Sequence, residues 1–344
     1  MELSDRKKAI LSEIVKLYIA TGEPIGSKIL CSILKNAPSG ATLRNEMSAL
    51  CEMGFLEQPH TSAGRVPTAD GYKMYIDSLM TRDTLSKEIK EHIDNVLDSA
   101  ECDPEKMPQK AGELLTEITG LPSIAANIAN NGVALKCIEL LPMGRRACML
   151  IIVLSDGRSR SRLCHLSNDL SPELISKFDK AVVEKVRGED IVSLTPAFMQ
   201  GLLASGGMDV LSLMPLISTL FEMINEISGS NISLKGESNL FSMYETKSVA
   251  DNILSLINKQ STLLPLMLSA NKPVNVFFGD DMGYAALKPS SVILAKYRVN
   301  GKDIGCIGVV GPTRMSYEHI IPSVEYTASR VGDKLSDTLR FLED

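Results

Sequence analysis

The first 67 residues carry the pattern that most restricts the fold of this chain: three short helices with tight stops between them, then a hairpin. Ile10, Ile14 and Leu17 recur at helical spacing and predict a first helix from about Ser4 to Ala20. The segment Thr21-Gly22-Glu23-Pro24 ends this helix, because glycine favours the terminal turn and proline cannot continue the hydrogen-bond ladder. The chain therefore begins with compact helices rather than one long rod.

Two further helices and a hairpin complete this unit. Residues 27–34 predict a short helix that starts on a Ser27 cap and ends at the break of residues 35–38. A third helix is predicted from near Ser39 to Gly54. Two extended pieces then surround a polar tip that contains Gly64, which is the pattern of a β-hairpin. Three helices and a hairpin with short turns are typical of a winged helix.

The third helix has two different faces. Leu43, Met47 and Leu50 share one side, since successive residues turn by about 100° around a helix. The opposite side is small and polar, with one arginine beside it: Ala41, Arg44, Asn45 and Ser48. The second helix of a helix-turn-helix pair lies in the DNA major groove with its first residues at the base edges. The third helix is therefore the best candidate for sequence recognition.

Side chains on the third helix and the hairpin suit a DNA contact. Arginine pairs with guanine through two hydrogen bonds and asparagine with adenine, so Arg44 and Asn45 are expected to recognise bases. Lys28 and Arg65 are expected to bind phosphates, which position a protein but carry no sequence information. The full set of expected DNA contacts is Lys28, Ser39, Thr42, Arg44, Asn45, Ser48, His60, Thr61, Ser62 and Arg65. The alternatives are an ordinary solvated helix face and a winged helix that binds protein.

The charge distribution permits a nucleic-acid contact without demanding one. The chain has a formal net charge of −6, but residues 1–80 hold equal numbers of basic and acidic residues, so the acidity lies downstream. A DNA-binding unit of such low charge favours a dimer, because two copies double the phosphate contacts that one copy makes.

Helices and strands follow the hairpin in blocks. A long helix is predicted from about Ala69 to Leu97 and a shorter one from Gln109 to Thr119. Strands are predicted on both sides of a mostly helical block at 171–264: Val133–Leu141, Ala147–Leu154 and Arg158–Cys164 before it, Val274–Gly279, Val292–Val299 and Asp303–Val310 after it. Asp156-Gly157 and Asn300-Gly301 predict hairpin turns. The pattern favours one sheet domain with a helical domain inserted, or alternatively two separate domains.

The helix predicted at 209–228 and the last helix of the chain each have a feature that bears on their bounds. Residues 209–228 predict a helix with an apolar side, and Asn231–Asn239 predicts a polar break after it. Ile320 and Val324 begin the apolar side of the last helix. Pro322 lies inside that pattern and has no amide hydrogen, so this helix is expected to start later or to kink.

No motif for catalysis, metal binding or nucleotide binding outweighs a structural explanation. Gly305, Gly308 and Gly311 lack the spacing of a dinucleotide fingerprint and indicate a strand that turns into the last helix. The four histidines are far apart and no two cysteines have metal-ligand spacing, so no metal or cofactor is expected. Cys164 and His165 are neighbours on a predicted strand and should point to opposite faces.

The remaining features bear on chemistry and compartment. Asp280-Asp281 follows a predicted strand and leaves an enzyme or a cation site open as an alternative to a polar loop. Seven scattered cysteines are typical of buried thiols in a reducing cytosol. The longest apolar run, Ala147 to Leu154, is much shorter than the about 20 residues that cross a bilayer. The charged N-terminus has no signal-peptide core, so a cytoplasmic protein outside the membrane is expected.

Four segments of the chain are distinctive. They are Tyr18-Ile-Ala-Thr-Gly-Glu-Pro-Ile-Gly-Ser27, Ala41-Thr-Leu-Arg-Asn-Glu46, Gly54-Phe-Leu-Glu-Gln-Pro-His-Thr-Ser-Ala-Gly-Arg-Val-Pro67 and Gly308-Val-Val-Gly-Pro-Thr-Arg-Met-Ser-Tyr317. Together they resemble the HrcA family, the heat-inducible transcription repressors of bacteria. The run from Glu57 to Pro67 is the most specific of them, and the resemblance spans essentially the whole chain.

The resemblance implies a non-catalytic repressor that blocks transcription of class I heat-shock operons as a homodimer on CIRCE, an inverted-repeat DNA operator. It implies activation by the GroE chaperonin, so that chaperone genes are expressed when unfolded proteins occupy the chaperonin. It implies an α+β multidomain fold: a winged helix-turn-helix at 1–80, a GAF-like α/β domain at 81–170 and 265–344, and a mostly helical inserted dimerisation domain at 171–264. The alternative is a GAF-type small-molecule sensor with a winged-helix output.

Overall fold

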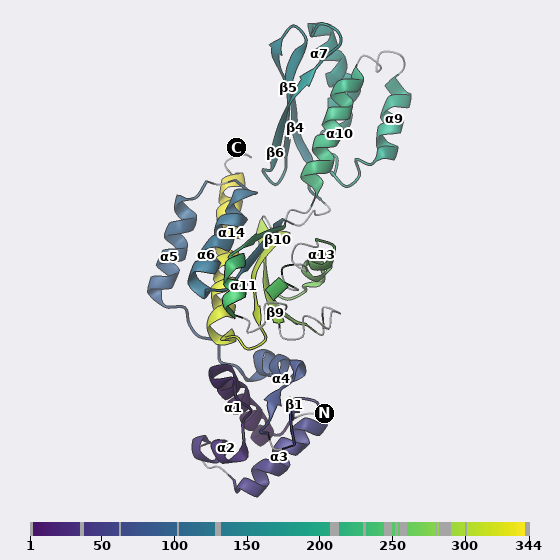
Figure 1. The fold of residues 1–344 in the computed structure, drawn as a ribbon. Helices are drawn as coiled ribbons and strands as arrows, with labels where there is room; N and C mark the ends of the chain where they lie inside the picture. The colour runs from purple at the N-terminus through teal and green to yellow at the C-terminus, as the bar shows by residue number, and fades with distance from the viewer. Residues whose placement is uncertain are drawn as a thin grey trace.

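The computed structural model describes residues 3–34, 38–61, 63–101, 103–127, 132–206, 213–229, 232–243, 250–251, 254, 260–279, 281, 290–299 and 301–340. These residues form an elongated molecule of three parts (Figure 1). A winged helix lies at one end, a five-stranded sheet with its helices in the middle, and a three-stranded sheet with other helices at the far end. No helix within the described ranges is long and apolar enough to span a membrane.

The N-terminal unit is a winged helix, as the sequence predicts. Its helices are α1 (Asp5–Thr21), α2 (Ser27–Ile33) and α3 (Gly40–Glu52), and its hairpin pairs β1 (Leu56–Glu57) with β2 (Val66–Pro67). One detail is wrong: α2 follows an extended Gly26 without a side-chain cap, so Ser27 is the first helical residue rather than the cap. Residues 35–37 of the predicted break lie outside the described residues.

The long helix predicted over 69–97 is interrupted, so that prediction is wrong. The helix α4 (Ala69–Met74) continues as one π-helical stretch, η1 (Tyr75–Leu79), and α5 (Lys87–Ser99) begins only after an extended segment. We call this segment, residues 80–86, the linker. A tertiary contact holds it away from helical geometry, because the Asp83 amide donates a hydrogen bond to the Glu318 carbonyl at 3.3 Å.

The middle domain is built on an antiparallel sheet with the order β7-β3-β10-β9-β8. The strands are β3 (Ser123–Asn127), β7 (Ile232–Lys235), β8 (Val274–Phe278), β9 (Ser290–Val299) and β10 (Lys302–Pro312). Helices α6 (Lys106–Thr119) and α14 (Tyr317–Arg340) cover one face, with α5 packed on their outer side, and α11 (Glu237–Met243) and α13 (Gln260–Ser269) cover the other face (Figure 1). Strand β7 falls inside the predicted polar break, so that prediction is wrong.

One apolar core joins the winged helix to the middle domain. Its buried side chains run from Leu11 and Leu50 through Tyr75 to Val309 and Val331 without a break. The opposite face of the five-stranded sheet has a smaller core of its own under α11 and α13. The winged helix is therefore packed into the body of the molecule and is not tethered by a free linker.

Residues 133–228 form a separate unit, which we call the distal unit. Its strands β4 (Leu135–Gly144), β5 (Ala147–Leu154) and β6 (Ser159–His165) form their own antiparallel sheet. Its helical segments are α7 (Pro172–Phe178), η2 (Asp179–Val183), α8 (Glu184–Val186), α9 (Pro196–Gly206) and α10 (Met214–Ser228). The prediction of one sheet on both sides of the helical block is therefore wrong. Sheet and helices share one core, so residue 171 lies inside the unit rather than at its edge.

The last helix, α14, begins at Tyr317 and contains Pro322, so the predicted later start is wrong. Proline has no amide hydrogen to offer the carbonyl four residues earlier, which is that of Glu318. This carbonyl accepts the hydrogen bond from Asp83 of the linker instead. A hydrogen bond between the linker and α14 thus replaces the helical hydrogen bond that Pro322 cannot form.

The predicted glycine turns are confirmed where the structure describes them. Gly157 adopts a left-handed φ of 83° in the turn that joins β5 to β6. Gly301 does the same at φ 78° between β9 and β10, while Asn300 lies outside the described residues. Gly308 and Gly311 lie in β10, which leads into α14 as the sequence indicates.

Candidate nucleic-acid interface

Helix α3 is anchored by its apolar side and presents its polar side. Leu43 and Leu50 are fully buried and Met47 is 4% exposed, as the helical pattern predicts. Arg44 and Asn45 are exposed, and within the described ranges neither side chain has a hydrogen bond or an ion pair. Both predicted base-recognition side chains are therefore available to a partner.

The start of α3 is organised by two of the predicted contact residues. Ser39 precedes the helix, and its Oγ accepts a hydrogen bond from the Thr42 amide at 3.2 Å. The two hydroxyl groups also share a hydrogen bond of 2.9 Å. A hydroxyl in such a cap keeps further capacity to donate or accept. The cap therefore fixes the first helical turn and leaves both groups able to bind phosphate. Ser48, further along α3, is half-buried.

The wing tip is shaped by Gln58, a residue that the sequence analysis did not single out. Its side-chain amide donates hydrogen bonds to the carbonyls of Thr61 and Ala63 at 2.9 and 3.1 Å. The Ala63 amide closes the tip by donating to the His60 carbonyl at 2.9 Å. The side chains of His60 and Thr61 are exposed, and Ser62 lies outside the described residues. The sequence signal for this role is a glutamine directly before the proline of the polar tip.

Backbone pairing joins the wing to the helix-turn-helix. Ile25, just before α2, exchanges two backbone hydrogen bonds of 2.9 Å with Arg65. Gly64 permits this approach, because a Cβ at position 64 would overlap the Ile25 carbonyl. The wing therefore keeps a fixed position relative to α2 and α3.

The two predicted phosphate contacts have different surroundings. Lys28 is exposed on α2 and has no ion pair with another described residue. Arg65 is half-buried, with Nη1 at 3.5 Å from the carbonyls of Ala63 and Gly64. Its Nε is buried without a hydrogen-bond partner in the described part of the chain. Arg65 therefore supports the wing from within, whereas Lys28 projects freely.

The acidic side chain in the middle of α3 is neutralised from α1. Glu46 follows Asn45, and its carboxylate forms ion pairs with Lys7 at 2.8 Å and with Arg6 at 3.8 Å. Its side chain is only 17% exposed. These pairs offset a negative charge that would otherwise repel DNA phosphates near the recognition helix.

Aromatic contacts fix the winged helix on the middle domain. The ring of Tyr72 in α4 packs on those of Phe278 and Tyr317, with centroids 5.9 Å apart in each pair. Burial raises the pKa of Tyr72 and of Tyr75 well above the usual range, so both phenols stay neutral. Polar contacts across the same junction are Lys73–Asp281, Lys272–Asp77 and Tyr75–Glu318.

Other candidate sites have structural explanations. The Asp281 carboxylate accepts a hydrogen bond from the Phe278 amide at 3.0 Å and pairs with Lys73 at 2.6 Å, so it ties α4 to the middle domain. Asp280 lies outside the described residues. Cys164 is buried and His165 exposed, which confirms that they point to opposite faces. Within the described ranges, no three metal-binding side chains gather at one place.

Two family models match nearly the whole chain. The model described as "Winged helix-turn-helix transcription repressor, HrcA DNA-binding" matches residues 2–79. The model described as "HrcA protein C terminal domain" matches residues 105–321.

Curated relatives agree with these models, and one solved structure shares the fold. The heat-inducible transcription repressor HrcA of Carboxydothermus hydrogenoformans is 31% identical over 96% of this chain and 98% of its own length. That of Chromobacterium violaceum is 30% identical over 97% of this chain and 99% of its own length. A crystal structure described as that of a hypothetical protein has a TM-score of 0.62 at 22% identity, covering 98% of this chain and 100% of that one. At this identity the structure bears on the fold alone.

Proposed function

Since this chain belongs to the HrcA family of heat-inducible transcription repressors, we propose that it represses class I heat-shock operons as a homodimer bound to the inverted-repeat operator CIRCE. The observation that supports this most directly is the exposed pair Arg44 and Asn45 on a helix whose other side is buried. A repressor of this kind acts by occupying the promoter and needs no catalytic group. We place it in the cytoplasm, where a bacterial chromosome lies.

The contacts divide into two kinds. Arg44 and Asn45 recognise base edges in the major groove. Guanine accepts two hydrogen bonds from an arginine, whereas adenine accepts one from an asparagine amide and donates one to its oxygen. The other contacts bind the sugar–phosphate backbone and set the register of the protein on the duplex. They are Lys28, Ser39, Thr42, Ser48, His60, Thr61, Ser62 and Arg65.

The open face of the distal sheet is our candidate for the dimer contact. Leu141, Met149 and Leu163 lie side by side across β4, β5 and β6. Leu141 is 46% exposed and Leu163 47%, although the other face of this sheet is buried in the distal core. An apolar row of this kind on an otherwise polar surface is typical of an interface. A two-fold contact through the distal unit would give the pair of winged helices the same symmetry as a palindromic operator.

The remaining roles follow from the family. We propose that the middle domain is the GAF-like part, since it combines a five-stranded antiparallel sheet with helices on both faces. We propose that the distal unit is the inserted dimerisation domain, with its start before residue 171. The GroE chaperonin raises repressor activity when it is free of unfolded protein.

The test is a gel-shift titration of the full chain against a promoter fragment that carries the inverted repeat. One shifted species with two protomers per fragment is expected, and addition of chaperonin should increase the active fraction. A fragment with scrambled half-sites is the control. Equal affinity for both fragments would contradict sequence-specific repression, and a monomer on the full operator would contradict the dimer.

A further inference from the structure

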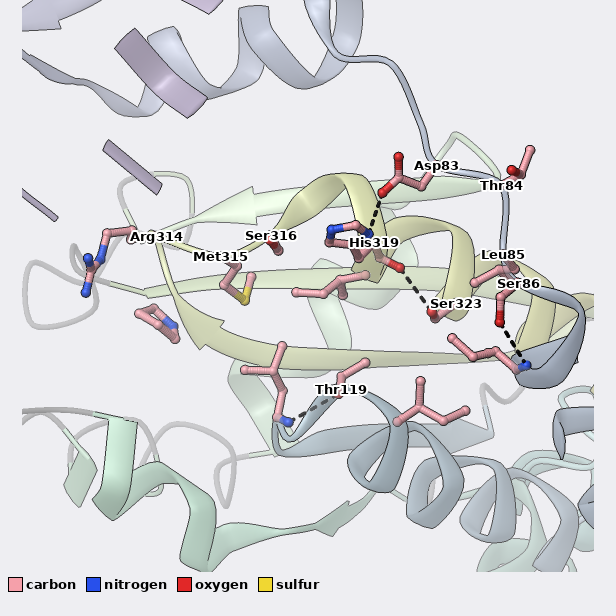
Figure 2. A pocket seen from close by; sticks show the side chains of 15 residues that line it. Asp83, Thr84, Leu85, Ser86, Thr119, Arg314, Met315, Ser316, His319 and Ser323 are labelled. Atoms are coloured by element: carbon pink, nitrogen blue, oxygen red, sulfur yellow. Dashed lines mark hydrogen bonds and ion pairs between the residues drawn. The ribbon is translucent and has the colours of Figure 1, made fainter. Parts of the chain in front are cut away.

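A cavity of about 650 Å³ lies where the linker meets the turn from β10 into α14. Its walls come from the linker, the first turn of α5, the end of α6 and residues 312–323 (Figure 2). This volume is within the range of about 300–1,000 Å³ that small-molecule sites occupy. The cavity is distinct from the DNA-binding surface on α3 and the wing.

Much of the cavity wall is apolar, and several of its hydroxyl groups already have partners. Ile89, Ile118, Leu121 and Ile320 supply the apolar surface. The Ser86 hydroxyl caps α5 by accepting a hydrogen bond from the Ile89 amide. The hydroxyl groups of Thr119 and Ser323 donate hydrogen bonds to the carbonyls of Leu115 and His319. The wall therefore suits a ligand with an apolar body.

Not every charged side chain around the cavity has a partner among the described residues. The Asp83 carboxylate contacts Nδ1 of His319 at the rim (Figure 2). Arg314 is the one Lys or Arg among the lining residues, and it lies at the end nearest the winged helix. Its guanidinium has no hydrogen bond or ion pair with another residue that the structure describes. The Arg314 guanidinium is therefore free to pair with an anionic group of a ligand.

We propose that this cavity binds a small carboxylate with an apolar body. The carboxylate pairs with the Arg314 guanidinium, because planar guanidinium and carboxylate groups form two parallel hydrogen bonds. The apolar body packs against the isoleucine and leucine side chains of the wall and is thereby removed from contact with water. A neutral or cationic molecule of the same shape lacks the pairing with Arg314 and binds more weakly.

Arg314 also gives the site a connection to the winged helix. Its guanidinium lies against Gly22, so closely that a Cβ at position 22 would collide with it. Gly22 ends α1 in the left-handed region at φ 75°. A ligand on Arg314 therefore sits beside the last turn of a helix that supports the recognition helix.

The test uses the full chain and three probes of equal length: octanoate, 1-octanol and octylamine. Titration calorimetry should show saturable binding of octanoate, with affinity at least about tenfold above that of the other two, as expected for a charge-assisted pair. Equal affinity for the three probes, or no saturable binding of octanoate, would overturn the proposal. The assay contains no DNA, so its outcome is independent of the proposed repressor function.

Two variants locate the binding. Arg314→Met keeps the length of the side chain and removes its charge, and should reduce octanoate affinity to that of 1-octanol. Arg145→Met, in the β4–β5 turn of the distal unit, is the matched control and should bind octanoate like the parent. Ile118→Trp should fill the cavity and weaken all three probes together. Octanoate affinity unchanged in Arg314→Met would place the binding elsewhere and overturn the assignment.

Discussion

The amide of Asp83 donates a hydrogen bond of 3.3 Å to the carbonyl of Glu318, which is the carbonyl that Pro322 leaves without a donor in α14. The proline therefore does more than interrupt a helical ladder. It frees an acceptor at the place where the linker from the winged helix passes over the last helix. The side chains of Asp83 and His319 also contact each other beside this hydrogen bond.

Replacing the proline tests this relationship. In Pro322→Ala the new amide competes with Asp83 for the Glu318 carbonyl, so the Asp83 amide should exchange its hydrogen with solvent faster than in the parent. Hydrogen-exchange mass spectrometry of the linker measures the rate. Pro108→Ala is the control, because Pro108 lies in the first turn of α6, where amides have no helical acceptor. Unchanged exchange at Asp83 would show that the tie does not depend on the proline.

Arg44→Ala should weaken operator binding by about 1–3 kcal/mol and relax the choice of base at one position of each half-site. The side chain is exposed and makes no contact that holds the fold, so the free energy of unfolding should change little. Gel-shift titrations against single-base operator variants measure both effects. An unaltered operator affinity would remove Arg44 from the recognition surface.

Lys28→Ala should weaken binding to all sequences alike, because a phosphate contact carries no base information. The slope of log affinity against log salt concentration should decrease by about 1. Titrations at several salt concentrations measure this slope. Lys136→Ala, in the distal unit far from the winged helix, is the matched control. A base-dependent loss in Lys28→Ala would contradict the assigned role.

Gly64→Ala should destabilise the winged helix by about 1–3 kcal/mol, because the added Cβ would overlap the Ile25 carbonyl and force the wing away from α2. Thermal unfolding measures the loss of stability, and gel shifts measure the accompanying loss of DNA affinity. Gly144→Ala is the control, since nothing lies within 4 Å of a Cβ at that position. If both variants behaved alike, the close approach at Gly64 would have no energetic importance.

Leu163→Glu should convert the proposed dimer to a monomer, with association weakened by about a hundredfold or more, since a two-fold contact buries the new charge twice. Analytical ultracentrifugation measures the change. Leu268→Glu introduces the same charge at an exposed leucine of α13, 55% exposed, and should leave association unchanged. A dimer that persists in Leu163→Glu would move the contact away from the open sheet face.

Local signals explain which elements the sequence predicts well. The stop after α1, the start of α3 near Ser39 and the apolar spacing of α3 depend on neighbours in sequence, and they agree with the structure. The break at residues 80–86 contains no glycine or proline. Its local signal is the Ser86 cap of α5, and the Asp83 amide donates a tertiary hydrogen bond to the Glu318 carbonyl. A helical pattern cannot reveal a tertiary hydrogen bond.

Strand pairing is harder to predict from the sequence than helix positions. β3 is only Ser123–Asn127 and consists mainly of small residues, and β7 lies among polar residues, so neither has a strong alternating pattern. Alternation also does not specify which strands pair, so the pattern cannot distinguish one sheet from two. At the interface, the exposure of Arg44 followed from periodicity, whereas the half-buried state of Arg65 depends on its backbone pairing with Ile25.

The unbroken core from α1 to α14 leaves the DNA-binding end without a hydrophobic interior that it owns alone. Warming that loosens the packing beneath α14 therefore also loosens the support of α3, because both draw on one set of buried contacts. We therefore expect the winged helix and the middle domain to unfold together rather than as independent units.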